Sequence, residues 1–390
     1  MRDQKQRKNM RIAPLLLAAA VLVGVAEISR VGGGALEKAG ENAALFLAGA
    51  TMPDLGLAML RDRLRSEVVF ERDEGEGTFI PAQTVWPPPQ VAEQEQDHGE
   101  AAEAVDSQAT QPPASSVRPP RIPDRYAAPI INENFSGRGL SHLIEYGNGL
   151  IKNDTRLDAD TVEDILEIPW GVYFEETLEP QVLIVHTHAT ESFERFDRDI
   201  YDIRNTWRST DNNNNMVAVG DAMAQVLEEN GIGVLHDTTQ HDYPSYGGSY
   251  NRSAQSIKRY LEEYPTIKIV LDLHRDAMDR NGTQIKPVIM VDGQKAAQIM
   301  IISACDSGNM GIPDWRENLR FAAEFQHYME SIIPEITRPV WLCYRKYNMD
   351  LTPGSLLVEI GSNANTLEEA VFSARLAGEA LSELIWNRME

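Results

Sequence analysis

The sequence predicts an α/β domain with a mainly parallel, twisted sheet and helices on both of its faces. Short apolar runs alternate with longer amphipathic segments over the last two-thirds of the chain, and Gly231 and Pro265 close two of these segments as helix ends do. Histidines and carboxylates also cluster just after the apolar runs. Strands that alternate with helices are typical of α/β folds built on a parallel sheet.

The individual elements follow from about residue 131, where the composition becomes globular. The segment "PQVLIVHTH" (180–188) predicts a buried strand, because four consecutive apolar residues follow a proline-containing turn. Further strands are predicted over residues 231–237, 266–277 and 354–366. Helical spacing predicts one helix after each strand, over residues 215–231, 250–265, 317–334 and 367–389.

Composition and charge exclude several classes of protein. The chain has 390 residues, 42% of them hydrophobic, which is enough for one or two buried cores. Its formal net charge of −23 argues against a nucleic-acid partner, because phosphate binding requires clustered Lys and Arg. Two cysteines, Cys305 and Cys343, exclude a disulfide framework and a cysteine-rich zinc site. Two buried thiols and a single bridge between them both remain open.

The N-terminus predicts a signal anchor over residues 1–30. The basic stretch "MRDQKQRKNMR" precedes an uncharged apolar run over 12–26, which is the layout of a signal sequence or anchor. Basic residues tend to stay in the cytoplasm, so the rest of the chain is expected outside it, attached to the cell membrane by a single pass. Small residues near Ala26 leave cleavage open as an alternative.

The stretch between the anchor and the folded domain divides into two parts. Residues 31–70 are expected to be a juxtamembrane region, since a second apolar stretch there is interrupted by Pro53 and Asp54. Residues 71–130 are rich in Pro, Glu, Gln, Ala and Ser and have few large apolar side chains. Such a segment cannot bury enough surface to offset chain entropy, so a flexible tether is predicted, with the catalytic domain over 131–390.

Chemistry-bearing side chains gather at the ends of the predicted strands. The carboxyl ends of parallel strands meet at one edge of a sheet, and ligands bind in the crevice outside that edge. The residues that the predicted strand ends bring to this edge are His186, His188, Glu191, His236, His241, His274, Asp276 and Glu359. Their repeated placement at one edge predicts a functional site there.

The motif His188-x-x-Glu191 predicts a zinc site, with His274 from a neighbouring strand end as the third ligand. Catalytic zinc commonly takes two His and one Glu and keeps one position for water. Glu359 then fits the general base that activates this water and later protonates the leaving amine. The combination predicts hydrolysis of an amide without a covalent intermediate. His186 is the rival of His188: the two share a face of an extended segment, but His188 lies further past the strand end.

Four motifs in order give the chain a family resemblance. The strings "VLIVHTHATESF", "HDYPSYGGSYNRSAQSI", "DLHRDA" and "LLVEIGSNANTLEEA" together resemble stage II sporulation protein P. This resemblance covers about residues 131–390 and implies a zinc N-acetylmuramoyl-L-alanine amidase that also has endopeptidase action on peptide cross-links. It further implies a zinc amidase-like fold, peptidoglycan as substrate, a place between the membranes of the sporangium during engulfment, and a membrane-anchored lytic transglycosylase, stage II sporulation protein D, as partner.

The resemblance also assigns roles to single residues. His188 matches the first zinc ligand of the zinc amidases, His274 the ligand after the third strand, and Glu359 the late catalytic glutamate. The amidases take their middle ligand from a following helix, whereas the corresponding helix here begins "NNNNMVAVG" and offers no Glu. Glu191 fits that role instead, through the H-x-x-E spacing seen in zinc carboxypeptidases.

Three further residues have two readings each. Arg252 could bind a peptide carboxylate or only hold a helix start, and His241 could line the substrate groove or pin a loop. Asp276 could orient a ligand histidine or be a plain surface charge. Two other functions also stay open for the chain as a whole: a catalytically inactive wall-binding regulatory module, and a zinc carboxypeptidase that trims stem peptides.

Overall fold

The computed structural model of the chain describes residues 119–306, 308 and 310–389. The expected anchor, the juxtamembrane region and most of the expected tether lie outside these residues. Within the described part, no helix is both long and apolar enough to cross a membrane. The first described elements are a short 3₁₀ helix, η1 (Asp124–Tyr126), and strand β1 (Ala127–Glu133), which begins four residues before the expected domain start at 131.

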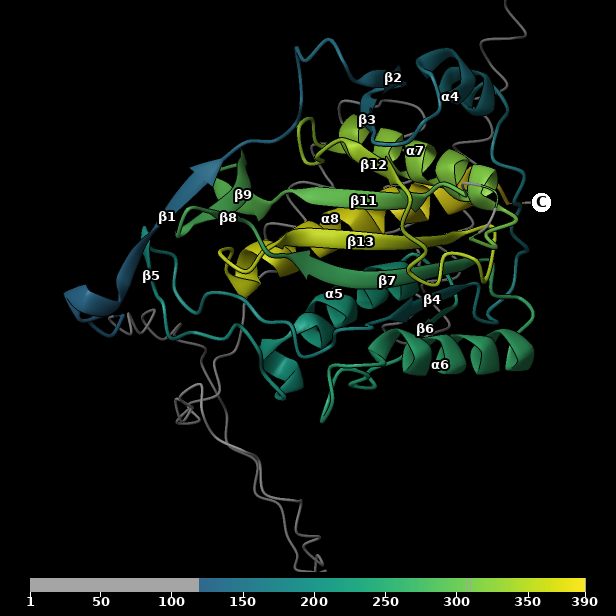
Figure 1. The fold of residues 1–390 in the computed structure, drawn as a ribbon. Helices are drawn as coiled ribbons and strands as arrows, with labels where there is room; N and C mark the ends of the chain where they lie inside the picture. Colours follow the sequence, from purple (N-terminus) through teal and green to yellow (C-terminus); the bar gives the residue numbers. More distant parts are fainter. Residues whose placement is uncertain (1–118, 307, 309, 390) are drawn as a thin grey trace, which may run out of the picture.

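The centre of the fold is an eight-stranded sheet (Figure 1). In spatial order its strands are β2 (Ile144–Tyr146), β3 (Gly149–Asn153), β12 (Val340–Cys343), β11 (Ile299–Ala304), β13 (Ser355–Ser362), β7 (Ile269–Asp276), β4 (Val182–Val185) and β6 (Val234–His236). The pairs β13–β7, β7–β4 and β4–β6 are parallel, whereas β11 runs antiparallel to β13. On the other side of that junction, β11, β12 and β3 are again parallel to one another.

The predicted α/β class is confirmed, and its four strands and four helices are all present. The four expected strands are the four parallel neighbours β6, β4, β7 and β13, so their carboxyl ends do meet at one edge. The sheet as a whole is mixed, because β11 enters it in the opposite direction after the β9–β10 hairpin. A short, fully buried run such as "IMIISA" carries no signal of strand direction.

Helices cover the sheet on both faces (Figure 1). The larger layer contains α5 (Met216–Glu229), α7 (Trp315–Ile332) and α8 (Leu367–Trp386), with α4 (Ala159–Leu166) packed on α7. These helices share a core with alternate residues of the central strands, such as Ile184 and Leu271. The other face carries α6 (Ser249–Glu263), whose Ile257 packs on Leu183 and Val185.

Local sequence fixes where the helices start. Thr366 caps α8 by accepting a hydrogen bond from the Glu369 amide, while the Glu369 side chain accepts from the Thr366 amide, which is a capping box. Asn215 caps α5 in a similar way, through the amide of Val217. Gly248 precedes α6 with φ +81°, a left-handed conformation that glycine adopts without a Cβ penalty.

A second, smaller sheet lies beside the first. Its order is β10 (Gln294–Ala297), β9 (Thr283–Val291), β1 and β5 (Ile200–Asp202), with β8 (Asp279–Arg280) paired to β9. The buried Lys286 of β9 ties this sheet to the core, because its Nζ lies 2.9 Å from Asp197 and 3.1 Å from Glu369. A short 3₁₀ helix, η2 (Asn212–Asn214), leads into α5.

Candidate active site

The end of β4 separates His186 from His188. The strand stops at Val185 and residues 187–190 form a turn, so the two histidines face opposite sides of the sheet. His186 lies on the α5 side, where a Cβ added to Gly220 would meet its Nε2 at 2.6 Å. His188 lies on the α6 side, against the ring of Tyr250. The expectation that the two share a face is therefore wrong, because it assumed a strand that continues to residue 188.

His186 has both ring nitrogens engaged. Its Nδ1 lies 3.1 Å from the carbonyl oxygen of Leu273, and its Nε2 lies 2.8 Å from Nε2 of His236. His236 in turn reaches Oδ1 of Asp221 at 2.9 Å. Burial, together with the neighbouring His236, lowers the pKa of His186 to about 3. These contacts leave His186 without a nitrogen to offer a metal.

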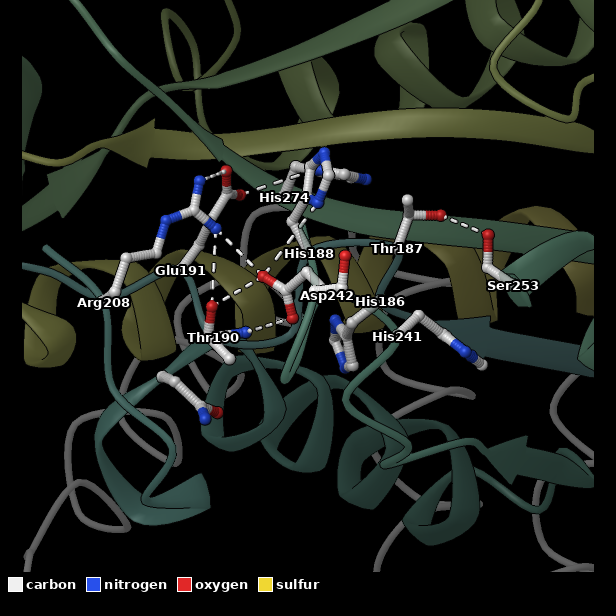
Figure 2. A network of polar contacts seen from close by, with 12 residues as sticks. His186, Thr187, His188, Thr190, Glu191, Arg208, His241, Asp242, Ser253 and His274 are labelled. Atoms are coloured by element: carbon white, nitrogen blue, oxygen red, sulfur yellow. Dashed lines mark hydrogen bonds and ion pairs between the residues drawn. The ribbon is translucent and has the colours of Figure 1, made fainter. Parts of the chain in front are cut away.

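His188, Glu191 and His274 come together on the α6 side (Figure 2). The rings of His188 and His274 are 5.3 Å apart and perpendicular, and Nδ1 of His274 lies 3.5 Å from Oε2 of Glu191. Two atoms bound at ~2.0–2.1 Å to a tetrahedral zinc lie roughly 3.3 Å apart, so this pair has nearly the spacing of two ligands. Nδ1 of His188 is buried and has no hydrogen-bond partner within the described part of the chain.

A buried carboxylate stands behind His274. Oδ1 of Asp272 lies 2.9 Å from Nε2 of His274, and Asp272 accepts hydrogen bonds from both the amide and the hydroxyl of Thr187. A carboxylate on the far nitrogen of a ligand histidine fixes its orientation. Asp276, which the sequence offered for this role, instead pairs with Arg338 at 2.9 Å.

The charges of Glu191 and His188 suit a cation, whereas His274 must first lose a proton. Burial raises the pKa of Glu191, but the hydrogen bond from His274 and the charge of Arg275 outweigh it and lower the value to about 2. Burial lowers the pKa of His188 to about 4, so its imidazole is neutral. Burial also acts to lower the pKa of His274, yet the adjacent Asp272 and Glu191 carboxylates raise it well above its usual value.

Glu359 lies next to this group, on β13. It is in register with His274 of the neighbouring strand, and its Oε2 is buried without a hydrogen-bond partner among the described residues. Burial, followed by the charge of Asp276, raises the pKa of Glu359 to about 8. A carboxyl group that titrates near neutrality suits general acid–base work.

The donor set fits zinc in chemistry, and only in part in arrangement. The Glu191–His274 pair has ligand-like spacing, and His188 offers an unpaired nitrogen beside it. Among the residues that the structure describes, however, no group of three or more His, Cys, Asp or Glu has a metal-holding arrangement. The zinc ion and its three ligands therefore stay a prediction.

Two arginines hold the glutamate in place, and sequence reasoning missed both. Arg208 donates to Oδ2 of Asp242 at 3.0 Å and to Oε1 of Glu191 at 3.4 Å (Figure 2). The amide of Arg275 donates to Oε2 of Glu191 at 3.2 Å, and its side chain donates to the carbonyl oxygen of Ser192. Arg275 directly follows His274, a signal that could have been used, whereas nothing in the local pattern singles out Arg208.

The loop between β6 and α6 uses its own polar side chains internally. Arg252 donates to the carbonyl oxygens of His241, Ser245 and Gly247, at 2.7, 2.5 and 3.0 Å. Nε2 of His241 lies 3.3 Å from Oδ2 of Asp237. This geometry gives Arg252 and His241 loop-holding contacts, and their roles toward a substrate stay predictions.

A cavity of about 250 Å³ opens beside His188. Tyr246, which is 58% exposed, stacks flat on the His188 ring at 4.4 Å and lies under the guanidinium of Arg208. The backbone of Gly247 and Gly248 forms the rim with residues 249–251. The cavity therefore gives a ligand access to the side of the site formed by His188.

Comparison with known families shows to which family the chain belongs. The family described as stage II sporulation protein P matches residues 77–382, which is more than half of the sequence. The chain belongs to the stage II sporulation protein P family. This match includes all the site residues described above and confirms the resemblance read from the four motifs.

One curated relative of this family is stage II sporulation protein P of Bacillus subtilis (strain 168). It is 29% identical over 217 residues, which make up 53% of this chain and 51% of the relative. The chain therefore spans about half the length of the curated relative that it matches.

The comparison with solved structures gives matches at low identity and low TM-score. The CwlD amidase of Clostridioides difficile, solved in complex with the GerS lipoprotein, is 12% identical and covers 53% of this chain and 99% of its own, with a TM-score of 0.32. The N-acetylmuramyl-L-alanine amidase Ami1 of Mycobacterium abscessus is 11% identical and covers 52% and 98%, with a TM-score of 0.31.

Proposed function

We propose that this protein is a zinc-dependent N-acetylmuramoyl-L-alanine amidase that acts on the cell wall during sporulation. Its reaction is hydrolysis of the amide between N-acetylmuramic acid and the L-alanine of stem peptides, with endopeptidase action on cross-links. The observation that carries the proposal is the meeting of His188, Glu191, His274 and Glu359 at one sheet edge, in a member of this family.

His188, Glu191 and His274 would hold the zinc ion. When bound, zinc lowers the pKa of water and polarises the carbonyl group of an amide. The chain prepares for a cation by keeping Glu191 ionised and His188 neutral. His274 must give up a proton before its Nδ1 can act as a ligand, so zinc binding should release protons and weaken as the pH falls.

Glu359 carries the proton in the proposed reaction. It takes a proton from the attacking water and delivers it to the nitrogen of the leaving amine, so one side chain serves as base and then as acid. Its position in register with His274 places it beside the proposed ligands without needing it as one. The unpaired Oε2 leaves an acceptor free for this water.

The organisation of the whole chain is part of the same proposal. A signal anchor over residues 1–30 and a tether over 71–130 hold the catalytic domain outside the cytoplasm, between the membranes of the sporangium. The substrate is peptidoglycan, and stage II sporulation protein D is the membrane-anchored partner that the family resemblance implies. Two alternative functions remain: an inactive wall-binding module and a carboxypeptidase. Each predicts products that differ from those of an amidase.

The experiment that tests this function is digestion of purified sacculi by the full chain, with and without a chelator, followed by mass spectrometry. An amidase releases intact stem peptides and leaves glycan strands free of peptide, and a chelator stops both. Stem peptides that only become shorter would indicate the carboxypeptidase. An absence of soluble products from zinc-loaded protein would indicate the binding module and would refute the proposal.

A further inference from the structure

Tyr250, in the first turn of α6, packs against both of the proposed zinc-binding imidazoles. Its ring meets that of His188 edge-on, at 5.5 Å and 81°, and is nearly parallel to that of His274, at 6.4 Å and 11°. Tyr347 stacks on it at 5.4 Å. The position of the phenol ring is thus set by aromatic neighbours that include the ligands themselves.

The backbone of Tyr250 is held as firmly as its ring. Its carbonyl oxygen accepts hydrogen bonds from Nδ2 of Asn348, at 3.0 Å, and from the hydroxyl of Ser253, at 3.2 Å. Ser253 also bonds to the hydroxyl of Thr187, which directly precedes His188 (Figure 2). The start of α6 is therefore tied to the turn that carries the first proposed ligand.

The hydroxyl of Tyr250 makes no hydrogen bond to any of the residues that the structure describes. The side chain is only half-buried and lines the 250 Å³ cavity next to His188. A held ring with an unused hydroxyl on a cavity wall offers a hydrogen-bond donor to whatever occupies the cavity.

Donors for negative charge are otherwise scarce at this site. Glu191, Asp272 and Glu359 present carboxylate groups, and the two nearby guanidinium groups already serve protein acceptors: Arg208 donates to carboxylates, and Arg275 donates to backbone carbonyls. Amide hydrolysis moves negative charge onto the carbonyl oxygen, and donors aimed at that oxygen are typically the largest contribution to the rate.

We propose that Tyr250 is a further catalytic residue, whose hydroxyl donates a hydrogen bond to the carbonyl oxygen of the scissile amide. The inference rests on the function proposed above. As the water oxygen bonds to the carbonyl carbon, Glu359 takes a proton from the water and the π electron pair moves onto the carbonyl oxygen. The hydroxyl of Tyr250 stabilises this negative oxygen by a hydrogen bond and keeps its own proton. The pair then returns, the carbon–nitrogen bond breaks, and the nitrogen takes the proton from Glu359.

The test is Tyr250→Phe in the zinc-loaded full chain, with Tyr260→Phe on the same helix as the matched control. The turnover number of Tyr250→Phe on soluble muropeptides should fall about 10²–10³-fold, as when one oxyanion donor is removed, while KM, zinc content and Tm stay near the wild-type values. Tyr260→Phe should leave the turnover within about twofold. A phosphinate analogue of the scissile amide should bind Tyr250→Phe more weakly, and the substrate itself should not.

The outcomes distinguish failure of the inference about Tyr250 from failure of the proposed amidase function. A wild-type chain that releases no stem peptides would refute the proposed function and the inference with it. An active wild type beside a Tyr250→Phe variant of nearly equal turnover would overturn the inference alone. Loss of zinc or a lowered Tm in Tyr250→Phe would also overturn it, because the ring would then act only through folding or metal retention.

Discussion

The two faces of the central sheet differ in whether a buried imidazole has hydrogen-bond partners. On the α5 face, both nitrogens of the buried His186 have partners within hydrogen-bond distance, 3.1 Å from Leu273 and 2.8 Å from His236. On the α6 face, two residues further along the chain, Nδ1 of the buried His188 has none among the described residues. Glu359, on the same side, also leaves a buried oxygen unpaired.

This difference separates groups that stabilise the fold from groups kept for a ligand. A buried polar atom without a partner costs about 1–3 kcal/mol, so most are paired, and those that are not require an explanation. For a cluster of such atoms beside a cavity, the explanation is that a bound ion or substrate would supply the missing partners. Substitutions on the two faces of the sheet should therefore have different effects.

The largest expected effect is at Glu359 and concerns rate alone. Glu359→Gln should lower turnover on sacculi by about 10²–10⁴-fold, because it removes the group that transfers the proton. Zinc content and Tm should be retained, since Glu359 is no ligand in the proposed site. An unfolded or zinc-free variant would contradict this assignment, and near-native turnover would do so too.

The two histidines should differ in stability when both are measured without zinc. His186→Ala removes two buried contacts and leaves a cavity, and we expect a loss of about 2–5 kcal/mol in the free energy of unfolding. His188→Ala also removes a buried ring, but Nδ1 of that ring has no hydrogen-bond partner among the described residues, so we expect a smaller loss than for His186→Ala. Zinc binding should show the reverse order, with His188→Ala alone abolishing it. Denaturant unfolding and metal analysis of both variants test the contrast, and equal losses of stability would break it.

Two glycines extend the comparison to the backbone. A Cβ at Gly220 would lie 2.5 Å from Nε2 of His236 and 2.6 Å from Nε2 of His186, so Gly220→Ala should cost about 1–3 kcal/mol despite alanine's better helix propensity. A Cβ at Gly247, on the cavity rim, would meet nothing within 4 Å. Gly247→Ala is therefore the matched control, and its unfolding midpoint should stay close to that of the wild type.

A further expected effect is a pH dependence of stability in the zinc-free protein. The pKa of Glu359 is about 8 in the folded chain against an ordinary 4.5, so the folded state holds an extra proton between these values. This contribution makes the protein less stable as the pH rises through that window. Glu359→Gln should remove it, so the two stability curves should diverge between about pH 4.5 and about pH 8. Parallel curves would show that Glu359 titrates normally.

Much of the fold could be predicted because each element carries its own local signal. The run 182–185, the β-branched strand 269–276 and the helix that ends before Gly231 are all recognisable without their neighbours. The reversed direction of β11 could not be predicted, because it depends on pairing between residues far apart in the sequence. The second sheet was missed for the same reason, since β1 pairs with β9 some 150 residues later (Ile130 with Gln284).

The candidate site was predictable to the extent that strand ends supply it. His274 and Glu359 lie in register toward the carboxyl ends of adjacent parallel strands, so their proximity follows from topology. The placement of Asp272 behind His274 follows from alternation along β7 and was overlooked in favour of Asp276. Arg208 lies on an irregular segment with no period to read, and only the folded chain brings it to Glu191.

The side chain of Arg252 has a consequence for how this protein can evolve. One guanidinium fixes three carbonyl oxygens of the loop above the site, so the course of that loop depends little on the side chains at its tip. A substitution at Tyr246, which lines the cavity, can then alter what the cavity rim recognises without redirecting the chain. Arg252 itself has no such freedom, because its loss would leave those three carbonyl oxygens without their donor. The protein thus combines a candidate site held by the sheet edge with a cavity rim whose residues can change separately.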